Sequence, residues 1–132
     1  MRVGDDIVGA IDHGAVLLVG VGRGDTLSDA QAAARKVSQL RIFNDAAGKL
    51  NESIHAVGGS FLVVSQFTLF GDCRKGNRPS FIEAAPPGLG RELYEAFIDA
   101  LRSLGHTVET GRFQEHMVVH LQNDGPVTLI LE

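Results

Sequence analysis

The residues of this sequence that could do chemistry form none of the common catalytic patterns. There is no GxSxG elbow, P-loop, HExxH helix motif or CxxC pair. By its type Thr68 is the natural candidate for a nucleophile, but a threonine within the chain needs an adjacent base, and its sequence neighbours supply none. From periodicity alone we expect Thr68 to be a strand residue whose hydroxyl makes a local hydrogen bond.

The histidines and the cysteine have simpler interpretations. His116 and His120 are four residues apart, which would suit one metal ion on a helix. The apolar residues between them predict a strand instead, on which four residues span roughly 13 Å. We therefore expect no metal site and place both histidines at the surface or at an interface. Cys73 lies beside Arg74 and Lys75, a setting that favours a reactive thiolate, yet we interpret it as an unreactive loop thiol.

The dipeptide Gly125-Pro126 is a structural signal of a different kind. It lies between two segments that are predicted as strands. Proline in a tight turn can adopt a cis peptide bond and would then fix the direction of the neighbouring carbonyl groups. Taken alone, the dipeptide is more often an ordinary turn.

Composition predicts one soluble domain. The chain has 132 residues, 44% of them hydrophobic, which is enough to bury a core in a single domain over residues 1–132. No apolar stretch is long enough to span a membrane, the N-terminus shows no signal segment, and Cys73 is the only cysteine. We therefore expect a protein of the reducing cytoplasm that has no membrane partner.

The charge of the chain limits how it could bind a nucleic acid. Its formal net charge is −4, which argues against broad neutralisation of phosphates by clustered Lys and Arg. Two local basic groups remain, and each is either an anchor for a few phosphates or ordinary solvated surface. These groups are Arg74, Lys75 and Arg78, and Arg35, Lys36 and Arg41.

The first half of the chain predicts a β-hairpin, a helix and a buried strand. Two apolar segments around a short turn indicate the hairpin. Ser28 and Gln31 match a capping box ahead of apolar residues at helical spacing. A later run of β-branched and aromatic residues is typical of a central strand, with the SQFTL segment inside it or at its end. The predicted spans are 6–11 and 15–22 for the hairpin, 28–41 for the helix and 61–70 for the strand.

The second half predicts a loop, a second helix and three strands. Apolar residues at helical spacing, followed by Gly105, define the helix. The predicted spans are 71–79 for the loop, 89–104 for the helix, and 107–109, 117–121 and 127–131 for the strands, the last two forming a closing hairpin. We expect an α+β fold, with a twisted, barrel-like and mostly antiparallel sheet on which two helices pack.

Two motifs resemble those of one known family. Residues 65–69, SQFTL, resemble a motif of the D-aminoacyl-tRNA deacylases, and residues 123–128, NDGPVT, resemble their NxGPxT motif. The motifs occur in the family's order, and the resemblance runs from about Asp5 to the C-terminus. Other stretches typical of the family are residues 40–43, 57–59, 74–81, 84–86 and 110–113.

The resemblance implies a homodimer that hydrolyses the ester between a D-amino acid, or glycine, and the 3′ end of tRNA. Gly125 and Pro126 of one subunit, joined by a cis bond, would enter the substrate pocket of the other. Their rigid carbonyl groups would leave no room for an L side chain, so that rejection works by a built-in clash. This suits a proofreading enzyme, which must spare the abundant L-aminoacyl-tRNA. The resemblance implies no metal and no cofactor.

The resemblance also implies roles for single residues. An aminoacyl ester is already activated, so the main needs are to position water and to stabilise the oxyanion, which main-chain N–H groups around Gln66, Phe67 and Thr68 would do. The terminal ribose 2′-OH would assist, and Thr68 would position rather than attack. Phe113 would stack on the terminal adenine. The expected pocket residues are Ser65, Ala85, Met117, Asn123 and Thr128, and those expected near the tRNA 3′ end are Arg74, Lys75 and Arg78.

One feature departs from the family's pattern. Family members begin with an additional basic strand before the segment that opens here at residues 3–5, and this sequence lacks it. We therefore expect an unpaired sheet edge and a looser pocket. Two other functions stay open: a catalytically weak module that binds an RNA end or an amino acid, and a structural domain in which Gly125-Pro126 is only a turn.

Overall fold

A parallel three-stranded sheet forms the centre of the structure. In the computed structural model, which describes residues 1–132, β6 (Ser60–Ser65) lies between β3 (Gly14–Val19) and β7 (Val108–Thr110). β3 and β7 both run parallel to β6. The four residues Phe61 to Val64 of β6 are all buried, as expected for a central parallel strand covered on both faces.

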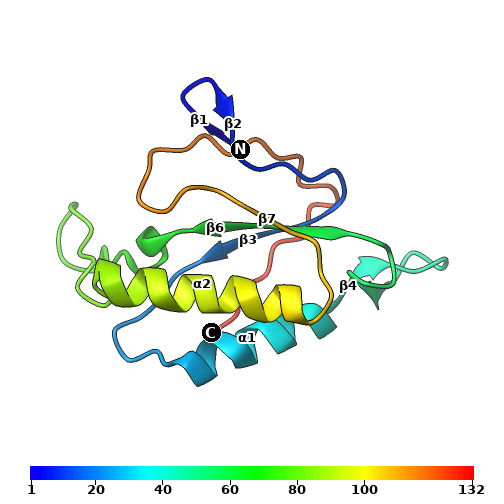
Figure 1. Ribbon diagram of the computed structural model, residues 1–132, viewed down its shortest axis with the longest axis horizontal. Helices are drawn as coiled ribbons and strands as arrows, with labels where there is room; N and C mark the ends of the chain where they lie inside the picture. Colours follow the sequence, from blue (N-terminus) through cyan, green and yellow to red (C-terminus); the bar gives the residue numbers. More distant parts are fainter.

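Two helices cover one face of this sheet (Figure 1). α1 (Leu27–Gln39) begins after Thr26, whose side chain forms a capping box with Asp29. The predicted box at Ser28 and Gln31 is therefore wrong by two residues, because Thr26 and Asp29 offer the same spacing two residues earlier in the chain. α2 (Pro87–Ser103) begins at a proline, whose fixed φ suits a first helical turn.

The apolar face of α2 supplies much of the main core. Tyr94, Phe97 and Leu101 are buried at helical spacing, and the core also contains Phe61 and Val63 of β6. Beyond the helix Gly105 has a φ of +91°, a conformation that glycine adopts readily at a helix end. The helix predicted over 89–104 is thus confirmed, with a start two residues earlier.

The predicted N-terminal hairpin is wrong. β2 (Asp6–Ile7) pairs antiparallel with β1 (Arg2–Val3), whereas β3 pairs with β6. Glycine at position 14 allows the start of β3 to approach β6 closely, because a Cβ there would lie only 2.6 Å from the main-chain nitrogen of Ser60. A sequence pattern shows that a segment is a strand but not which distant strand it joins. For the same reason the prediction of a mostly antiparallel sheet is wrong for the central sheet.

Other strand predictions need correction too. The strand predicted over 61–70 ends at Ser65, and the antiparallel pair β4 (Arg41–Asn44) and β5 (Leu50–Ser53) was not predicted. Residues 117–121 and 127–131 are not strands, because their only ladder contact is an isolated bridge between Arg2 and Val118. The strands form three separate sheets, none of them closed, so the barrel-like shape stays a prediction.

A second, smaller apolar cluster covers the other face of β6. Met1, Leu62 and Val64 are buried there, and Met117 packs against them. In Figure 1 the β1–β2 hairpin lies on this side, away from the helices. No helix is both long enough and apolar enough to cross a membrane.

Candidate active site

The SQFT motif lies where the central strand gives way to a turn. Ser65 is the last residue of β6, and the 3₁₀ helix η1 (Phe67–Phe70) begins two residues later. Gln66 between them has φ −140° and ψ 76°. Its N–H donates to the carbonyl oxygen of Val19 at 2.7 Å, which continues the pairing with β3. Thr68 therefore lies on a turn at the end of the sheet and not on the predicted strand.

Two adjacent main-chain N–H groups at the start of this turn make no hydrogen bond within the chain. The first donor of the turn is Leu69, whose N–H bonds the Gln66 carbonyl oxygen at 3.2 Å. The N–H groups of Phe67 and Thr68 precede it, as at the start of any helix. Both residues are exposed. Since the Gln66 N–H is already bonded, Phe67 and Thr68 are the pair that is free to bind an oxyanion.

The side chain of Thr68 is held by its neighbour. Its hydroxyl oxygen accepts a hydrogen bond from the Gln66 amide, which confirms the expected local bond. No histidine or carboxylate hydrogen-bonds this hydroxyl. A threonine without an adjacent base is a weak nucleophile. The arrangement therefore favours a positioning role for Thr68.

Glycines let the turn pack closely on the segment after β3. A Cβ on Gly20 would lie 3.0 Å from Cε2 of Phe70, and one on Gly22 would lie 3.1 Å from Cζ of the same ring. The segment also holds the chain before α2, because the Ala85 N–H donates to the Val21 carbonyl oxygen at 2.8 Å. Ala85 is thereby brought to the same edge of the sheet as the SQFT motif.

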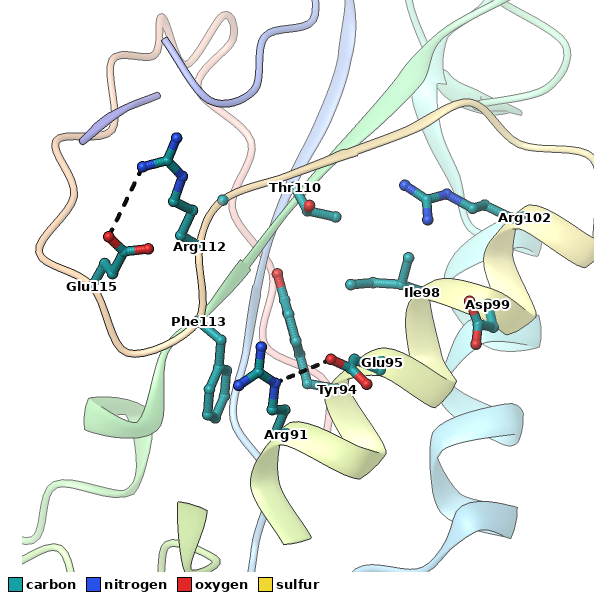
Figure 2. A pocket seen from close by; sticks show the side chains of 11 residues that line it. Arg91, Tyr94, Glu95, Ile98, Asp99, Arg102, Thr110, Arg112, Phe113 and Glu115 are labelled. Carbon is teal, nitrogen blue, oxygen red and sulfur yellow. Dashed lines mark hydrogen bonds and ion pairs between the residues drawn. The ribbon is translucent and has the colours of Figure 1, made fainter. Parts of the chain in front are cut away.

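Phe113 lies against the first turns of α2. Its ring is half-buried, with its centroid 5.9 Å from that of Tyr94 and 5.6 Å from Cζ of Arg91. Figure 2 shows the three side chains side by side. The Tyr94 hydroxyl donates to the Val63 carbonyl oxygen at 3.0 Å, and burial raises the pKa of Tyr94, which keeps this donor protonated. Phe113 thus lies on the helix side of β6, packed against the main core.

Met117 lies elsewhere. It packs with Leu62 and Val64, whose side chains point to the face of β6 opposite to that of Val63. Its Sδ accepts a hydrogen bond from the N–H of Arg112 at 3.3 Å. The structure therefore places Met117 on the far face of the sheet from the Phe113 ring.

The predicted basic residues occupy an exposed loop between η1 and α2. Arg74 donates to both carboxylate oxygens of Asp72, at 2.9 and 2.8 Å. Hydrogen bonding to Arg74 lowers the pKa of Asp72 to about 2, so the pair is ionised throughout the neutral range. Lys75 and Arg78 form no ion pair and are exposed. The positive charge available to a phosphate on this loop is therefore carried mainly by Lys75 and Arg78.

The NDGPVT motif forms an exposed loop with a cis peptide bond between Gly125 and Pro126. The Asn123 side chain closes it, because its Nδ2 donates to Oγ1 of Thr128 at 2.8 Å and its Oδ1 accepts from the N–H of Val127 at 3.2 Å. No hydrogen bond joins this loop to the SQFT motif. Within one chain the two motifs therefore remain separate.

Sequence reasoning missed the residues around Phe113. Arg91, Tyr94 and Glu95 share one face of α2, and Arg112 lies across from them. The available signal was their spacing of three and four residues on a helix whose other face is apolar. Such a polar face is usually only solvated surface, and the approach of the segment after β7 could not be deduced from periodicity.

Known proteins resemble this chain over its full length. The family model described as D-Tyr-tRNA(Tyr) deacylase matches residues 1–132. A relative from Desulforamulus reducens, named D-aminoacyl-tRNA deacylase, is 58% identical over 132 residues, which is 100% of this chain and 89% of the relative. One of the same name from Heliobacterium modesticaldum is 60% identical over 125 residues, covering 95% of this chain and 83% of the relative.

Solved structures show the same fold. One titled c-Myc DNA Unwinding Element Binding Protein superposes with a TM-score of 0.92 at 37% identity, covering 99% of this chain and 89% of the other. A second, titled as a probable eukaryotic D-amino acid tRNA deacylase, has a TM-score of 0.63 at 16% identity and covers 76% of this chain and 74% of the other, which supports the fold alone.

The fold and these relatives define the class of the protein as a hydrolase that acts on ester bonds. The chain belongs to the D-Tyr-tRNA(Tyr) deacylase family. The expected resemblance is therefore confirmed.

Proposed function

We propose that the protein deacylates D-aminoacyl-tRNA and glycyl-tRNA as a chiral proofreading step in the cytoplasm. The observation that supports this most directly is the pair of free N–H groups on Phe67 and Thr68 at an exposed turn. An ester carbonyl oxygen gains negative charge as it is attacked, and preorganised N–H donors stabilise that charge. The relatives of this chain carry the name of this activity.

The proposed reaction needs no covalent enzyme intermediate. The carbonyl oxygen of the ester binds the two N–H groups while water attacks the carbonyl carbon. The tetrahedral intermediate then collapses, the bond to the ribose oxygen breaks, and the proton lost by water goes to that oxygen, with help from the neighbouring 2′-OH. Thr68, held by Gln66, positions the ester or the water. No metal or cofactor takes part.

Chiral selection is assigned to Gly125 and Pro126 of a partner subunit. The loop is exposed and is closed by Asn123, so it could enter the pocket of a second copy without first unfolding. The residues that follow are apolar and exposed, with Ile130 86% exposed and Leu129 57% exposed. An exposed apolar segment of this kind favours an interface. Their carbonyl groups would occupy the space that an L side chain needs, so that only D residues and glycine could bind.

The direct test compares D-tyrosyl-tRNA with L-tyrosyl-tRNA at equal enzyme concentration and fixed salt. We expect release from the D ester and none above background from the L ester. Asn123→Ala, which removes both bonds that close the loop, should allow hydrolysis of the L ester. Hydrolysis of both esters by the unmodified protein would contradict chiral selection. Tight binding of the D ester without turnover would instead identify the catalytically weak binding module, and a monomer in solution would contradict selection by a partner.

A further inference from the structure

A cavity of about 500 Å³ lies between α2 and the segment that follows β7. The polar face of α2 forms one wall and the stretch from Thr110 to Glu115 forms the other (Figure 2). Its volume is in the range of small-molecule sites, and it exceeds the 220 Å³ hollow beside the basic loop. No residue of the SQFT or NDGPVT motif lines it, and of the residues given a role in the proposed function only Phe113 does.

Three guanidinium groups belong to this cavity, in a protein of net negative charge. Arg102 forms no ion pair. The nearest carboxylate oxygen to Nη1 of Arg112 is that of Glu115 at 3.9 Å, which is longer than a charge-assisted hydrogen bond. Arg91 pairs with Glu95 at 3.2 Å, with both side chains more than half exposed. Exposed ion pairs of this kind contribute little to stability, so an anionic ligand can take the place of the carboxylates beside Arg91 and Arg112.

The cavity also suits the base of a nucleotide. Tyr94 is only 5% exposed and Phe113 is the expected platform for the adenine, so the planar group left for a second base is the exposed guanidinium of Arg91. Unpaired bases stack on aromatic rings and also on arginine. Three carboxylates balance the three arginines, which disfavours a simple anion but suits a ligand with both a phosphate and amino groups. A carboxylate such as that of Asp99 can accept a hydrogen bond from the exocyclic amino group of cytosine.

We propose that this cavity binds the cytidine nucleotide that precedes the terminal adenosine of the tRNA, with the phosphate on Arg112. The inference rests on the proposed function, in which Phe113 is the platform for the terminal adenine. Phe113 lines the cavity, so the neighbouring nucleotide would enter it directly. The acceptor end would then be held by a local contact, as the net charge of the chain requires.

The test is the substitution Arg112→Gln, assayed on D-tyrosyl-tRNA and on D-tyrosyl-adenosine, which lacks the preceding nucleotide. We expect KM for the tRNA to rise at least about tenfold, with KM for the adenosine ester changed less than about twofold. The salt dependence of tRNA binding should also weaken by the equivalent of about one phosphate contact. Lys49→Gln is the matched control, because it removes the same charge from the exposed β4–β5 turn.

Two results would overturn this inference: equal tRNA KM values for the Arg112 and Lys49 variants, or an equal loss on both esters. A binding measurement separates it from the proposed function. Titration with the trinucleotide cytidylyl-cytidylyl-adenosine requires no turnover and should show at least about tenfold weaker binding to the Arg112 variant than to the control. If the unmodified protein hydrolyses no ester, the proposed function fails, and this titration alone decides whether the cavity binds the nucleotide.

Discussion

Replacement of Thr68 by alanine separates a positioning role from a nucleophilic one. In the structure the hydroxyl makes one hydrogen bond, from the Gln66 amide, and has no base beside it. A neutral hydrogen bond contributes about 0.5–1.5 kcal/mol, which corresponds to roughly a 2- to 13-fold change in rate. Removal of a covalent nucleophile lowers kcat by about 10⁶ in the serine protease subtilisin. We therefore expect Thr68→Ala to retain between about a thirteenth and about a half of wild-type kcat.

The assay is single-turnover release of D-tyrosine from its tRNA, with mass spectrometry of the quenched protein to detect an acyl-enzyme. Thr107→Ala is a suitable control, because Thr107 is also exposed but precedes β7 and lies beside Phe61, at the start of β6. A loss of kcat beyond about a thousandfold would contradict a positioning role, since no single neutral hydrogen bond accounts for it. So would an acyl group trapped on Thr68 in the wild-type protein.

Three further outcomes follow from the structure. Asp72→Asn should lower KM for tRNA and steepen its salt dependence, because it frees the Arg74 guanidinium; unchanged binding would show that Arg74 lies away from the RNA. Burial, and then the nearby His55, lower the pKa of His106 below its ordinary value of 6.5, so the unfolded state binds a proton at a higher pH than the folded state does. The free energy of unfolding should therefore fall as the pH drops from 6.5 through the lowered pKa of the folded state. Urea midpoints that are equal at pH 7.5 and 5.5 would contradict this. Tyr94→Phe should lower the free energy of unfolding by about 1 kcal/mol through loss of its hydrogen bond to Val63, and an unchanged melting temperature would argue against that bond.

The helices could be predicted because their signals are local. The apolar spacing over 89–104 and the glycine after it are properties of one continuous segment, and α2 follows them closely. The pairing of β3 with β6 could not be predicted, because the partner lies more than 40 residues away and depends on Gly14 meeting Ser60. The segments at 117–121 and 127–131 have the composition of strands, but composition does not provide a partner strand.

The SQFTL motif pointed to Phe67 and Thr68 as candidate site residues, and their role stays a prediction. The geometry could not be predicted, because a run of β-branched and aromatic residues does not show that the strand stops at Ser65. Beyond Ser65 the chain turns into η1, whose Phe70 ring packs closely on Gly20 and Gly22 of a distant segment. The free N–H groups exist only because the chain turns there.

The proposed mechanism depends on the N–H groups of Phe67 and Thr68, which stabilise the oxyanion. The most direct measurement replaces the Thr68 amide by an ester, using the corresponding α-hydroxy acid, and determines kcat for D-tyrosyl-tRNA. This change removes one N–H and keeps every side chain. We expect a loss of about 10²- to 10³-fold in kcat, the magnitude seen when one oxyanion donor is removed. A kcat within about twofold of wild type would contradict it, since the cost of removing such a donor is far larger.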